Sequence, residues 1–402
     1  MLVIVAPGQG AQTPGFLVPW LQDPTFADRI NWLSAVSDID LVHYGTKADA
    51  ETIRDTAIAQ PLLVGAGLLA ALALYPQPAA AFRTIDLVAG HSIGEITAAA
   101  GVGVISAEQA LVFARERGKA MAAAAAKTPS GMTAVLGGDP DEVLAAIEKH
   151  HLIAANNNGP GQVVASGRLT DLERFAAEPP TRARVVPLQV AGAFHTPLVA
   201  DAVEPLGRFA RAISTHDPRT RLLSNADGHV VHHGREVLDR IVAQVSSPVR
   251  WDLCMQTMTE LGVTGMLEIP PAGTLTGIAR RAMKGVETFA LKTPDQLDEA
   301  RAFVAKHGES SPLVGNPSWR LLVSPMKGVF TRRQASADDP NPVDGGVLEE
   351  GAVIGTVRGL RDEQAVTAPY GGTLAEWLVE DDTPVHPGQP LARLNPRDVS
   401  DT

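Results

Sequence analysis

One stretch, residues 86–95, constrains the fold more than any other part of the chain: Asp86-Leu-Val-Ala-Gly-His-Ser-Ile-Gly-Glu95. An apolar segment leads into a Gly-x-Ser-x-Gly turn, and small residues typical of a packed helix follow. Glycine at positions 90 and 94 removes the side chains that would clash where a buried strand turns sharply into a helix. We therefore expect a nucleophile elbow that exposes the hydroxyl group of Ser92.

Two interpretations of this stretch are open, because Ser92-Ile-Gly-Glu95 also fits the Ser-x-x-Glu capping box of an ordinary helix. If the turn is catalytic, the amide of Ile93, an unpaired donor at the positive end of the helix dipole, would stabilise an oxyanion beside Ser92. The turn Pro7-Gly-Gln-Gly-Ala-Gln12 follows the first apolar segment and lacks the lysine of a phosphate loop. Its use would be to supply the amide of Gln9 as a second oxyanion donor.

His195 is the candidate general base. Glycine at 192 and proline at 197 place it on a loop, from which an imidazole could reach Ser92. A surface histidine is the alternative. The adjacent histidine pairs at 150–151 and 232–233 have neither the spacing of metal ligands nor neighbouring cysteines, so we expect no metal site.

Two further polar residues belong to predicted helices. Arg117 lies in a helix expected from 106 to about 126, and a guanidinium group can hold a carboxylate through two parallel hydrogen bonds. Charges on a helix usually face solvent, so a solvated face is the alternative. Gln60 precedes a Leu/Ala-rich helix predicted over 61–74, where it is either an exposed residue at the helix start or a side chain that faces the site.

The domain organisation follows from length and periodicity. A chain of 402 residues should hold two or three domains. Residues 133–190 predict elements in the order β-α-β-β-α-β, typical of a ferredoxin-like subdomain at about 127–190. Residues 308–318 have the composition of a linker. Beyond it, two quasi-repeats of short strands and Gly/Pro turns over 319–397 predict a small pseudo-symmetric β-sandwich.

Composition limits the function classes. The formal net charge of -11 argues against general nucleic-acid binding. The single cysteine, Cys254, excludes an intrachain disulfide and a cysteine-based metal cluster, which fits a reducing compartment. Gly, Pro and charges interrupt the apolar runs, so we expect no segment of membrane-spanning length. The chain begins in an apolar strand instead of a basic leader, and we expect a cytoplasmic location.

The order of motifs in the first three quarters of the chain resembles one family. The motifs are Gly8-Gln-Gly-Ala-Gln12, Gly90-His-Ser-Ile-Gly-Glu95, Arg117-Gly118, Asn156-Asn-Asn-Gly-Pro-Gly-Gln-Val-Val164 and Gly192-Ala-Phe-His195. Through them, residues 1 to about 307 resemble malonyl-CoA:acyl carrier protein transacylases and the acyltransferase domains of polyketide and fatty acid synthases. The resemblance implies an α/β fold, namely an α/β-hydrolase-like core with a ferredoxin-like subdomain.

The resemblance also implies an activity and roles. It implies that malonyl-CoA, a coenzyme A thioester, gives its malonyl group to the phosphopantetheine thiol of an acyl carrier protein, in fatty acid or polyketide synthesis. No cofactor would be covalently bound. Ser92 would be the nucleophile, His195 the general base and acid, and Arg117 the clamp for the malonyl carboxylate. The amides of Gln9 and Ile93 would form the oxyanion hole.

Two finer points follow from the same resemblance. Family members orient the histidine through a main-chain carbonyl group, which here would come from near Val249 or Arg250. Ile93 after the nucleophile and Phe194 before the histidine look like the malonyl-selective pattern of the synthase domains.

Residues 320–396 resemble a biotin carboxyl carrier protein or lipoyl domain. The matching motifs are Ser324-Pro-Met-x-Gly-x-Phe330, Val366-Thr-Ala-Pro369 and Gly371-Gly-Thr-Leu374. The family carries its cofactor on a lysine at a hairpin tip, eight residues before the Ala-Pro proline, and here that position is Arg361. A guanidinium group cannot act as the amine nucleophile. Met326-Lys327 lies in the first repeat and is treated as a decoy, so we expect an unmodified docking or stabilising module whose partner is unknown.

Two rival functions come from other classes. A serine hydrolase or thioesterase of the α/β-hydrolase class shares the elbow and would take its acid from an intervening residue such as Asp141. A non-enzymatic scaffold is suggested only by Arg361. The presence of Ser92, His195 and Arg117 argues against a scaffold for the larger domain.

Overall fold

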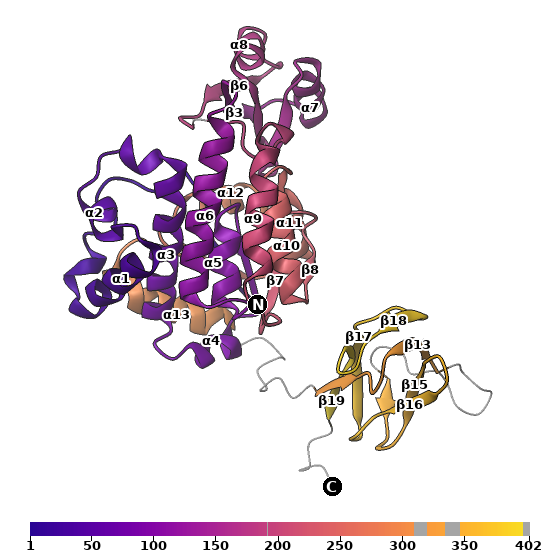
Figure 1. Ribbon diagram of the computed structural model, residues 1–402. Coiled ribbons are helices and arrows are strands. Elements are labelled where there is room, and N and C mark those ends of the chain that lie inside the picture. The colour runs from indigo at the N-terminus through magenta and orange to yellow at the C-terminus, as the bar shows by residue number, and fades with distance from the viewer. Residues whose placement is uncertain (191, 309–319, 334–345, 397–402) are drawn as a thin grey trace. The chain divides into compact units, whose positions relative to one another are not determined.

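The chain divides into two compact units, Met1–Val314 and Gly315–Thr402 (Figure 1). The computed structural model describes residues 1–190, 192–308, 320–333 and 346–396. The predicted linker at 308–318 lies outside the described residues, except for Gly308.

A six-stranded sheet in the order β11-β10-β1-β2-β7-β8 forms the centre of the first unit. Neighbouring strands are parallel, except that β7 and β8 pair antiparallel. Side chains along a strand alternate between the faces of a sheet, and here Leu2, Val3, Ile4 and Val5 are all buried. Both faces must therefore be covered. The strands are β1 (Leu2–Ala6), β2 (Leu87–Gly90), β7 (Arg221–Leu223), β8 (Val230–Val231), β10 (Gly265–Glu268) and β11 (Glu287–Ala290).

Helices cover the two faces unequally. Leu2 and Ile4 pack in the larger apolar cluster, and Val3 and Val5 in a smaller one with α11 (Trp251–Glu260) and α12 (Thr274–Ala282). The larger cluster contains residues of α1 (Pro24–Ser37), α2 (Leu41–Thr46), α3 (Thr56–Leu74), α5 (Gly94–Gly101), α6 (Ala107–Ala125), α9 (Val203–Arg211), α10 (Gly234–Gln244) and α13 (Leu297–Gly308). The remaining helix of this layer is α4 (Pro78–Thr84), and single 3-10 turns occupy Trp20–Gln22, Thr52–Arg54, Pro197–Ala202 and Pro294–Gln296.

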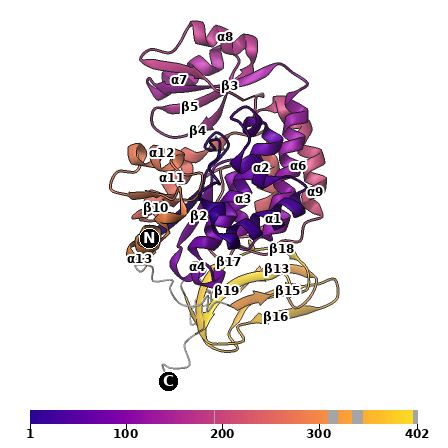
Figure 2. The same ribbon diagram turned by 90° about the vertical axis from the view of Figure 1, so that its left-hand side faces the viewer.

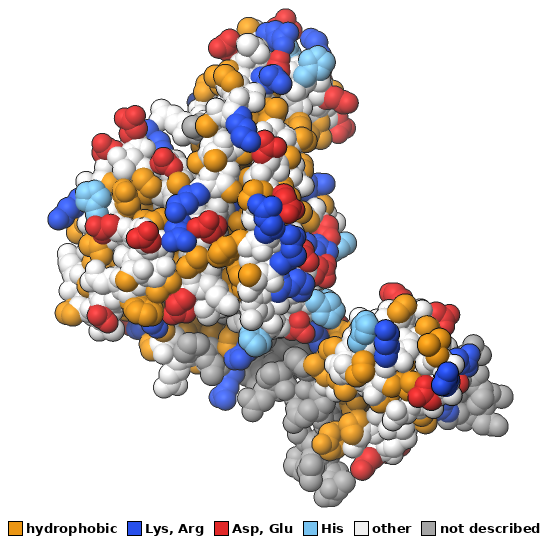
Figure 3. Space-filling view, in the orientation of Figure 1, with side chains coloured by type: hydrophobic (Ala, Val, Ile, Leu, Met, Phe, Trp, Pro, Cys, Tyr) orange, Lys and Arg blue, Asp and Glu red, His pale blue; other side chains and the backbone are white. Residues whose placement is uncertain are grey.

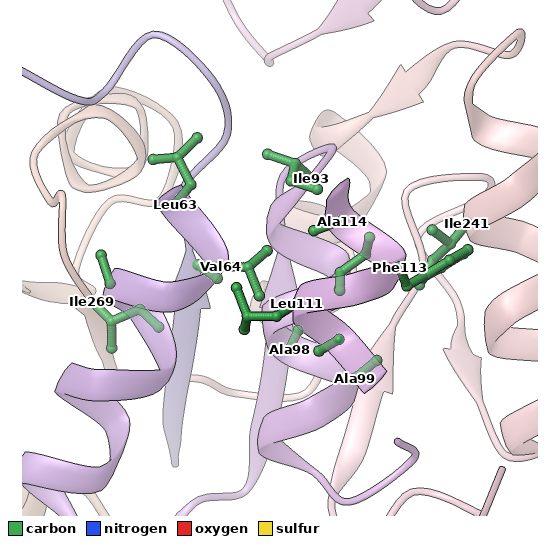
Figure 4. Close-up of a cluster of buried hydrophobic side chains, with 14 of the residues drawn as sticks. Leu63, Val64, Ile93, Ala98, Ala99, Leu111, Phe113, Ala114, Ile241 and Ile269 are labelled. Atoms are coloured by element: carbon green, nitrogen blue, oxygen red, sulfur yellow. The ribbon is translucent and has the colours of Figure 1, made fainter. Parts of the chain in front are cut away.

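The helix after the elbow is anchored by this larger cluster. Figure 4 shows Ala98 beside Leu111 of α6, next to Val64 of α3, and Ile93 in the same cluster nearer to Ala114. Protein interiors are packed as densely as organic crystals, so α5 cannot shift without moving its neighbours. The turn that carries Ser92 is thus held from the core side.

Helix α3 corrects two expectations from the sequence. It begins at Thr56 instead of at Pro61, because the side chain of Asp55 accepts a hydrogen bond from the amide of Ala57 and caps an earlier start. The complete helix is long and apolar enough to cross a membrane, with a mean hydropathy of 2.0, so the expectation that no segment reaches that length is wrong. In the folded chain 72% of that window is buried, as in the core helix of a globular domain.

The predicted β-α-β-β-α-β order is present above the central sheet (Figure 2). The second sheet has the order β6-β3-β5-β4-β9, and its first four strands are antiparallel. Strand β9 comes from outside this segment and pairs parallel with β4. The elements are β3 (Ser130–Gly137), α7 (Pro140–Lys149), β4 (Ile153–Asn157), β5 (Gln162–Arg168), α8 (Leu169–Ala177), β6 (Ala183–Pro187) and β9 (Val249–Arg250).

The second unit is all-β and internally duplicated. Its two four-stranded sheets have the orders β12-β19-β17-β14 and β16-β15-β13-β18. Corresponding strands of the two quasi-repeats occupy matching places in the two sheets, and a shared apolar core lies between them. The predicted pseudo-symmetric sandwich is present. The strands are β12 (Arg320–Val323), β13 (Gly328–Arg332), β14 (Val347–Leu348), β15 (Val353–Arg358), β16 (Glu363–Thr367), β17 (Gly372–Trp377), β18 (Thr383–Val385) and β19 (Pro390–Pro396).

Charges of both signs are mixed on the face of the first unit that Figure 3 shows. On α9, for example, Arg208 and Arg211 both lie within salt-bridge distance of Glu204. Exposed pairs of this kind contribute little to stability but neutralise each other's field.

Candidate active site

The turn after β2 has the geometry of a nucleophile elbow. Ser92 adopts a φ of 54°, in the left-handed region. A Cβ at Gly90 would lie 2.0 Å from the carbonyl carbon of Gly94, and one at Gly94 would lie 2.2 Å from the carbonyl oxygen of Ala6. Only glycine fits at these two positions. Helix α5 begins at Gly94 and no side chain caps it, so the capping-box interpretation is wrong.

Ser92 contacts the predicted histidine directly. The Oγ of Ser92 lies 2.8 Å from Nε2 of His195, and Nδ1 of His195 lies 2.8 Å from the main-chain oxygen of Gln244. A carbonyl oxygen can only accept, so Nδ1 carries the proton of the neutral ring and Nε2 is free to accept the Ser92 hydroxyl proton. The orienting carbonyl group belongs to the last residue of α10, and the expectation that it lies near Val249 or Arg250 is wrong.

The environment keeps His195 in its neutral, basic form. Burial, together with the nearby positive charge of Arg117, lowers the pKa of His195 to about 3. The imidazole is therefore unprotonated at neutral pH, which leaves the lone pair of Nε2 available to the Ser92 hydroxyl group.

Arg117 is buried in the site and does not lie on a solvated helix face. It is 0% exposed, and its guanidinium group donates to Oε1 of Gln60 at 2.9 Å and to Oε1 of Gln244 at 3.0 Å. Its Nε has no hydrogen-bond partner among the described residues. Gln244 joins this guanidinium group to His195, since it accepts from both. A buried cation with an unpaired donor is a suitable partner for a carboxylate.

Gln60 faces the site, so the ordinary interpretation of an exposed amide at a helix start is wrong. Because α3 begins five residues earlier than predicted, Gln60 lies in its second turn and is 1% exposed. Its Nε2 donates to the sulfur of Met121, which leaves Oε1 to accept from Arg117. Gly118 allows this approach of α6 to α3, because a Cβ there would lie 2.7 Å from the carbonyl oxygen of Thr56.

The two amides predicted for the oxyanion hole belong to the turns that follow two adjacent strands, β1 and β2. Ala6 of β1 pairs with Gly90 of β2, so the turns that follow both strands lie side by side. A Cβ at Gly8 would lie 2.9 Å from the ring and the carbonyl oxygen of His91. Among the described residues, neither the amide of Gln9 nor that of Ile93 donates to a backbone or side-chain group, whereas the side chain of Gln9 is tied to Arg54 and Thr56.

Three polar residues of the site were missed by the sequence analysis: Glu95, Asn225 and Gln244. All are buried. Glu95 was considered only as part of a capping box. Asn225 and Gln244 lie far from Ser92 in sequence and belong to no motif that we could identify, so only the fold brings them together.

The acid proposed for the hydrolase rival is not in the site. Asp141 is exposed at the start of α7, and Nδ1 of His195 is already occupied by the Gln244 carbonyl group. Among residues 1–190, 192–308, 320–333 and 346–396, no group of three or more His, Cys, Asp or Glu side chains could hold a metal ion.

A cleft of about 640 Å³ has Phe194, the neighbour of His195 in sequence, among its lining residues. The start of α3, the end of α6 and the segment that leads into His195 form its walls. Phe194 and Thr56 lie on its inner side, and Glu51, Arg54 and Asp55 line its rim.

Comparison with known proteins assigns most of the first unit to one family. Residues 3–309 match the model of the acyl transferase domain. The chain is 50% identical over 299 residues to the malonyl CoA-acyl carrier protein transacylase of Mycobacterium tuberculosis (strain H37Rv), a match that covers 74% of this chain and 99% of that protein. The Escherichia coli K12 protein of the same description is 30% identical over 308 residues, covering 74% and 97%.

Solved structures agree with these relatives. The crystal structure of MCAT from Mycobacterium tuberculosis matches with a TM-score of 0.72 at 50% identity, over 75% of this chain and 99% of that one. A second match comes from the structure of a type II PKS acyl carrier protein in complex with its malonyl-transacylase. The TM-score is 0.69 at 28% identity, and the match covers 75% of this chain and 99% of that chain.

Proposed function

Because this chain belongs to the family of malonyl-CoA:acyl carrier protein transacylases, we propose that its first 307 residues move a malonyl group from malonyl-CoA to the phosphopantetheine thiol of an acyl carrier protein. The observation that carries the proposal is the contact at 2.8 Å between Ser92 Oγ and a neutral His195. Gln244 ties this pair to the buried Arg117. No covalently bound cofactor takes part.

The first half-reaction forms a malonyl ester on Ser92. As Nε2 of His195 accepts the hydroxyl proton, Oγ bonds to the thioester carbon and the carbonyl electron pair moves onto oxygen. The amides of Gln9 and Ile93, which are free to donate, stabilise that oxyanion. The C–S bond then breaks, and His195 returns its proton to the sulfur of coenzyme A.

The second half-reaction runs the same steps with a different thiol. The pantetheine thiol of the carrier gives its proton to His195 and attacks the ester carbon. Ser92 then leaves with that proton as the acyl thioester forms. The cleft of about 640 Å³ that Phe194 and Thr56 help to line is the candidate path for the pantetheine arm, because Phe194 directly precedes His195.

Arg117 selects the acyl group in this scheme. A malonyl carboxylate supplies the acceptor that its unpaired Nε lacks. An acetyl group leaves the buried guanidinium group without a counter-ion, which is penalised when the transition state forms. The same argument favours transfer over the alternative, a serine thioesterase, because hydrolysis of uncharged acyl groups needs no buried cation.

Acyl-enzyme mapping tests the proposal. The full chain is incubated with malonyl-CoA or acetyl-CoA, and the peptide that contains Ser92 is examined by mass spectrometry. Malonyl-CoA should give a malonyl adduct on Ser92 within seconds, and acetyl-CoA should give little adduct in the same time. Label on another residue, or equal labelling by both thioesters, would count against the assignment.

For the second unit we propose a biotinyl/lipoyl-like module without the modified lysine. Arg361 lies in the turn between β15 and β16, which the amide of Gly359 closes by donating to the carbonyl oxygen of Asp362 at 2.8 Å. The Met326-Lys327 turn packs against that hairpin, since a Cβ added at Gly359 would lie 2.8 Å from Cε of Met326. The intact mass should show neither biotin nor lipoate. Arg361→Lys, treated with a biotin or lipoate ligase, should gain the group at position 361 and leave Lys327 unmodified.

The cellular setting is also part of the proposal. A single buried cysteine and relatives of the malonyl-transfer family support a cytoplasmic enzyme of fatty acid synthesis, with polyketide synthesis as the second pathway. The partner of the first unit in this proposal is an acyl carrier protein, and the second unit is assigned no partner.

A further inference from the structure

One buried carboxyl group, that of Glu95, contacts both amide-bearing residues around the site. Glu95 lies in the first turn of α5 and is 5% exposed. Its Oε1 accepts from the backbone amide of Asn225 at 2.7 Å, and its Oε2 accepts from Nε2 of Gln244. Neither partner is charged, so these contacts do not form an ordinary ion pair.

The contact with Asn225 leads to the nucleophile. Oδ1 of Asn225 accepts from the backbone amide of Ser92 at 2.8 Å, and its Nδ2 donates to the carbonyl oxygen of Gly90 at 2.8 Å. Asn225 therefore holds the elbow on both sides of His91. Glu95 fixes the backbone from which this side chain extends.

Gln244 connects Glu95 to the base, His195, and to the buried cation, Arg117. An amide group donates at one end and accepts at the other. Nε2 of Gln244 donates to Oε2 of Glu95 and to Oδ1 of Asn225. Its Oε1 must therefore face Arg117. The main-chain oxygen of the same residue orients His195. If this amide turned over, a donor would face the guanidinium group.

We propose that Glu95 is a positioning residue for malonyl transfer, because its carboxyl group sets the orientation of Gln244 and Asn225 and so aligns Arg117 with the Ser92–His195 pair. The inference rests on the proposed function. A role in packing alone does not account for Glu95, because an apolar side chain of similar volume is commonly as stable as a buried charged group, or more stable.

Electrostatics in the free site agrees with this assignment. Burial raises the pKa of Glu95 to about 8, against the lowering effect of Arg117 and Arg240. Burial lowers the pKa of Arg117 to about 10, and Glu95 opposes that change. The two groups therefore attract each other electrostatically, although they share no direct hydrogen bond.

Glu95→Gln is the first test, with Glu268→Gln as its matched control. The variants are compared at pH 9, where Glu95 is charged and both of its oxygens accept. In E95Q one of these accepting oxygens becomes a donor, which opposes either the Asn225 amide or Nε2 of Gln244. Glu268 is equally buried and accepts from the amides of Gly273, Leu275 and Thr276 at the start of α12, outside this network. Both variants thus lose an acceptor in the core of the same unit.

Two readouts separate positioning from loss of stability. One is the rate at which a fluorophosphonate labels Ser92, which reports the nucleophile and base. The other is the ratio of kcat/KM for malonyl-CoA over acetyl-CoA, which reports whether Arg117 is positioned to bind the malonyl carboxylate. For E95Q we expect both to fall by about 10-fold or more. For E268Q we expect both readouts to stay within about 2-fold of the unsubstituted chain, even if its Tm falls as far as that of E95Q.

A swapped variant, E95Q/Q244E, provides the rescue. The amide at position 95 can accept from Asn225 and donate to the carboxyl group at position 244, which in turn accepts from Arg117. Oδ1 of Asn225 loses its Gln244 donor but keeps the backbone amide of Ser92, so the rescue is expected to be partial. We expect fluorophosphonate labelling to recover to within about 10-fold of the unsubstituted chain. The preference for malonyl-CoA should stay low, because the carboxylate introduced at position 244 now pairs with Arg117.

Three results would overturn the proposal. E95Q could match the unsubstituted chain in both readouts, E268Q could lose as much as E95Q, or the swapped variant could label no faster than E95Q. If E95Q does not fold, the swapped variant is compared with the unsubstituted chain, and labelling more than about 100-fold slower would overturn the proposal. Failure of the proposed function is a separate result, since the unsubstituted chain would then form no malonyl-Ser92.

Discussion

Each unit of the molecule presents one residue at a tight turn, but the surroundings of the two residues differ. Ser92 sits in the elbow with His195 at 2.8 Å and a buried network of Glu95, Asn225 and Gln244 behind it. Arg361 sits in a hairpin turn closed by a hydrogen bond between the residues that flank Leu360 and Arg361, and Leu360 is fully exposed. The turn only displays a side chain. The buried polar groups around it determine whether that side chain reacts.

The largest expected effect is that of Ser92→Ala. The variant lacks the oxygen that forms the ester, so acyl-enzyme formation should disappear and kcat should fall by about 10⁴-fold or more. Arg361→Ala is the counterpart in the other unit and should leave malonyl transfer within about 2-fold. Intact-mass spectra after addition of malonyl-CoA, together with transfer rates, check both. A malonyl adduct on S92A would place the nucleophile elsewhere.

Arg117→Ala should have the next largest effect. Loss of the buried cation removes the partner of the malonyl carboxylate, and the ratio of kcat/KM for malonyl-CoA over acetyl-CoA should fall by about 10²-fold. Arg115 offers a control on the same helix, since its guanidinium group contacts Glu116 and the carbonyl oxygen of Ser37. Arg115→Ala should keep the preference. An unchanged malonyl preference in R117A would remove Arg117 from the acyl site.

The third effect concerns stability and pH. His195 has a pKa of about 3 in the folded chain and an ordinary value of 6.5 when unfolded. Above pH 6.5 both states are neutral. As pH falls from 6.5 towards 3, the unfolded chain takes up a proton that the folded site refuses, so the free energy of unfolding falls by up to about 1.4 kcal/mol per pH unit. Urea titrations at pH 7, 6 and 5 should show a shallower decline for His195→Gln. Equal slopes would contradict the buried, neutral imidazole.

The smallest expected effect is kinetic and concerns Glu95. With its pKa raised to about 8, Glu95 is largely neutral below that pH and charged above it. The charged form accepts from both the Asn225 amide and Nε2 of Gln244, whereas the protonated form carries a donor that opposes one of them, so Arg117 is best aligned above pH 8. The ratio of kcat/KM for malonyl-CoA over acetyl-CoA should therefore rise about 3- to 10-fold from pH 7 to pH 9. Parallel pH profiles for both thioesters would show that the carboxyl group does not sense the substrate.

Much of the first unit could be predicted from the sequence, because the features that define it depend on residues close together in the chain. The glycines of the elbow, the loop position of His195 and the β-α-β-β-α-β order are each encoded over a few residues, and the fold contains all three. The residues missed are those held by tertiary contacts. Gln244 ends a helix 49 residues after His195, and nothing nearby marks its carbonyl group as the orienting one. Gln60 was misplaced because the Asp55 cap outweighed the helix-opening signal of Pro61.

The second unit teaches the converse lesson. Its duplication and turn residues predicted two matching sheets, and the strand orders agree. In the biotinyl/lipoyl-like module that we propose, Arg361 stands at the position of the modified lysine, so the fold by itself implies no chemistry. The function of such a unit therefore has to be argued from its surface and its partners, and not from its architecture.

The central claim is that the acyl group on Ser92 is held for a second thiol. Malonyl-enzyme is isolated and mixed with a holo acyl carrier protein, and the malonyl thioester of the carrier and free malonate are followed over time. We expect the thioester to appear much faster than malonate, and malonate release to stay slow without the carrier. Malonate released at one rate with or without the carrier would contradict transfer and identify a hydrolase.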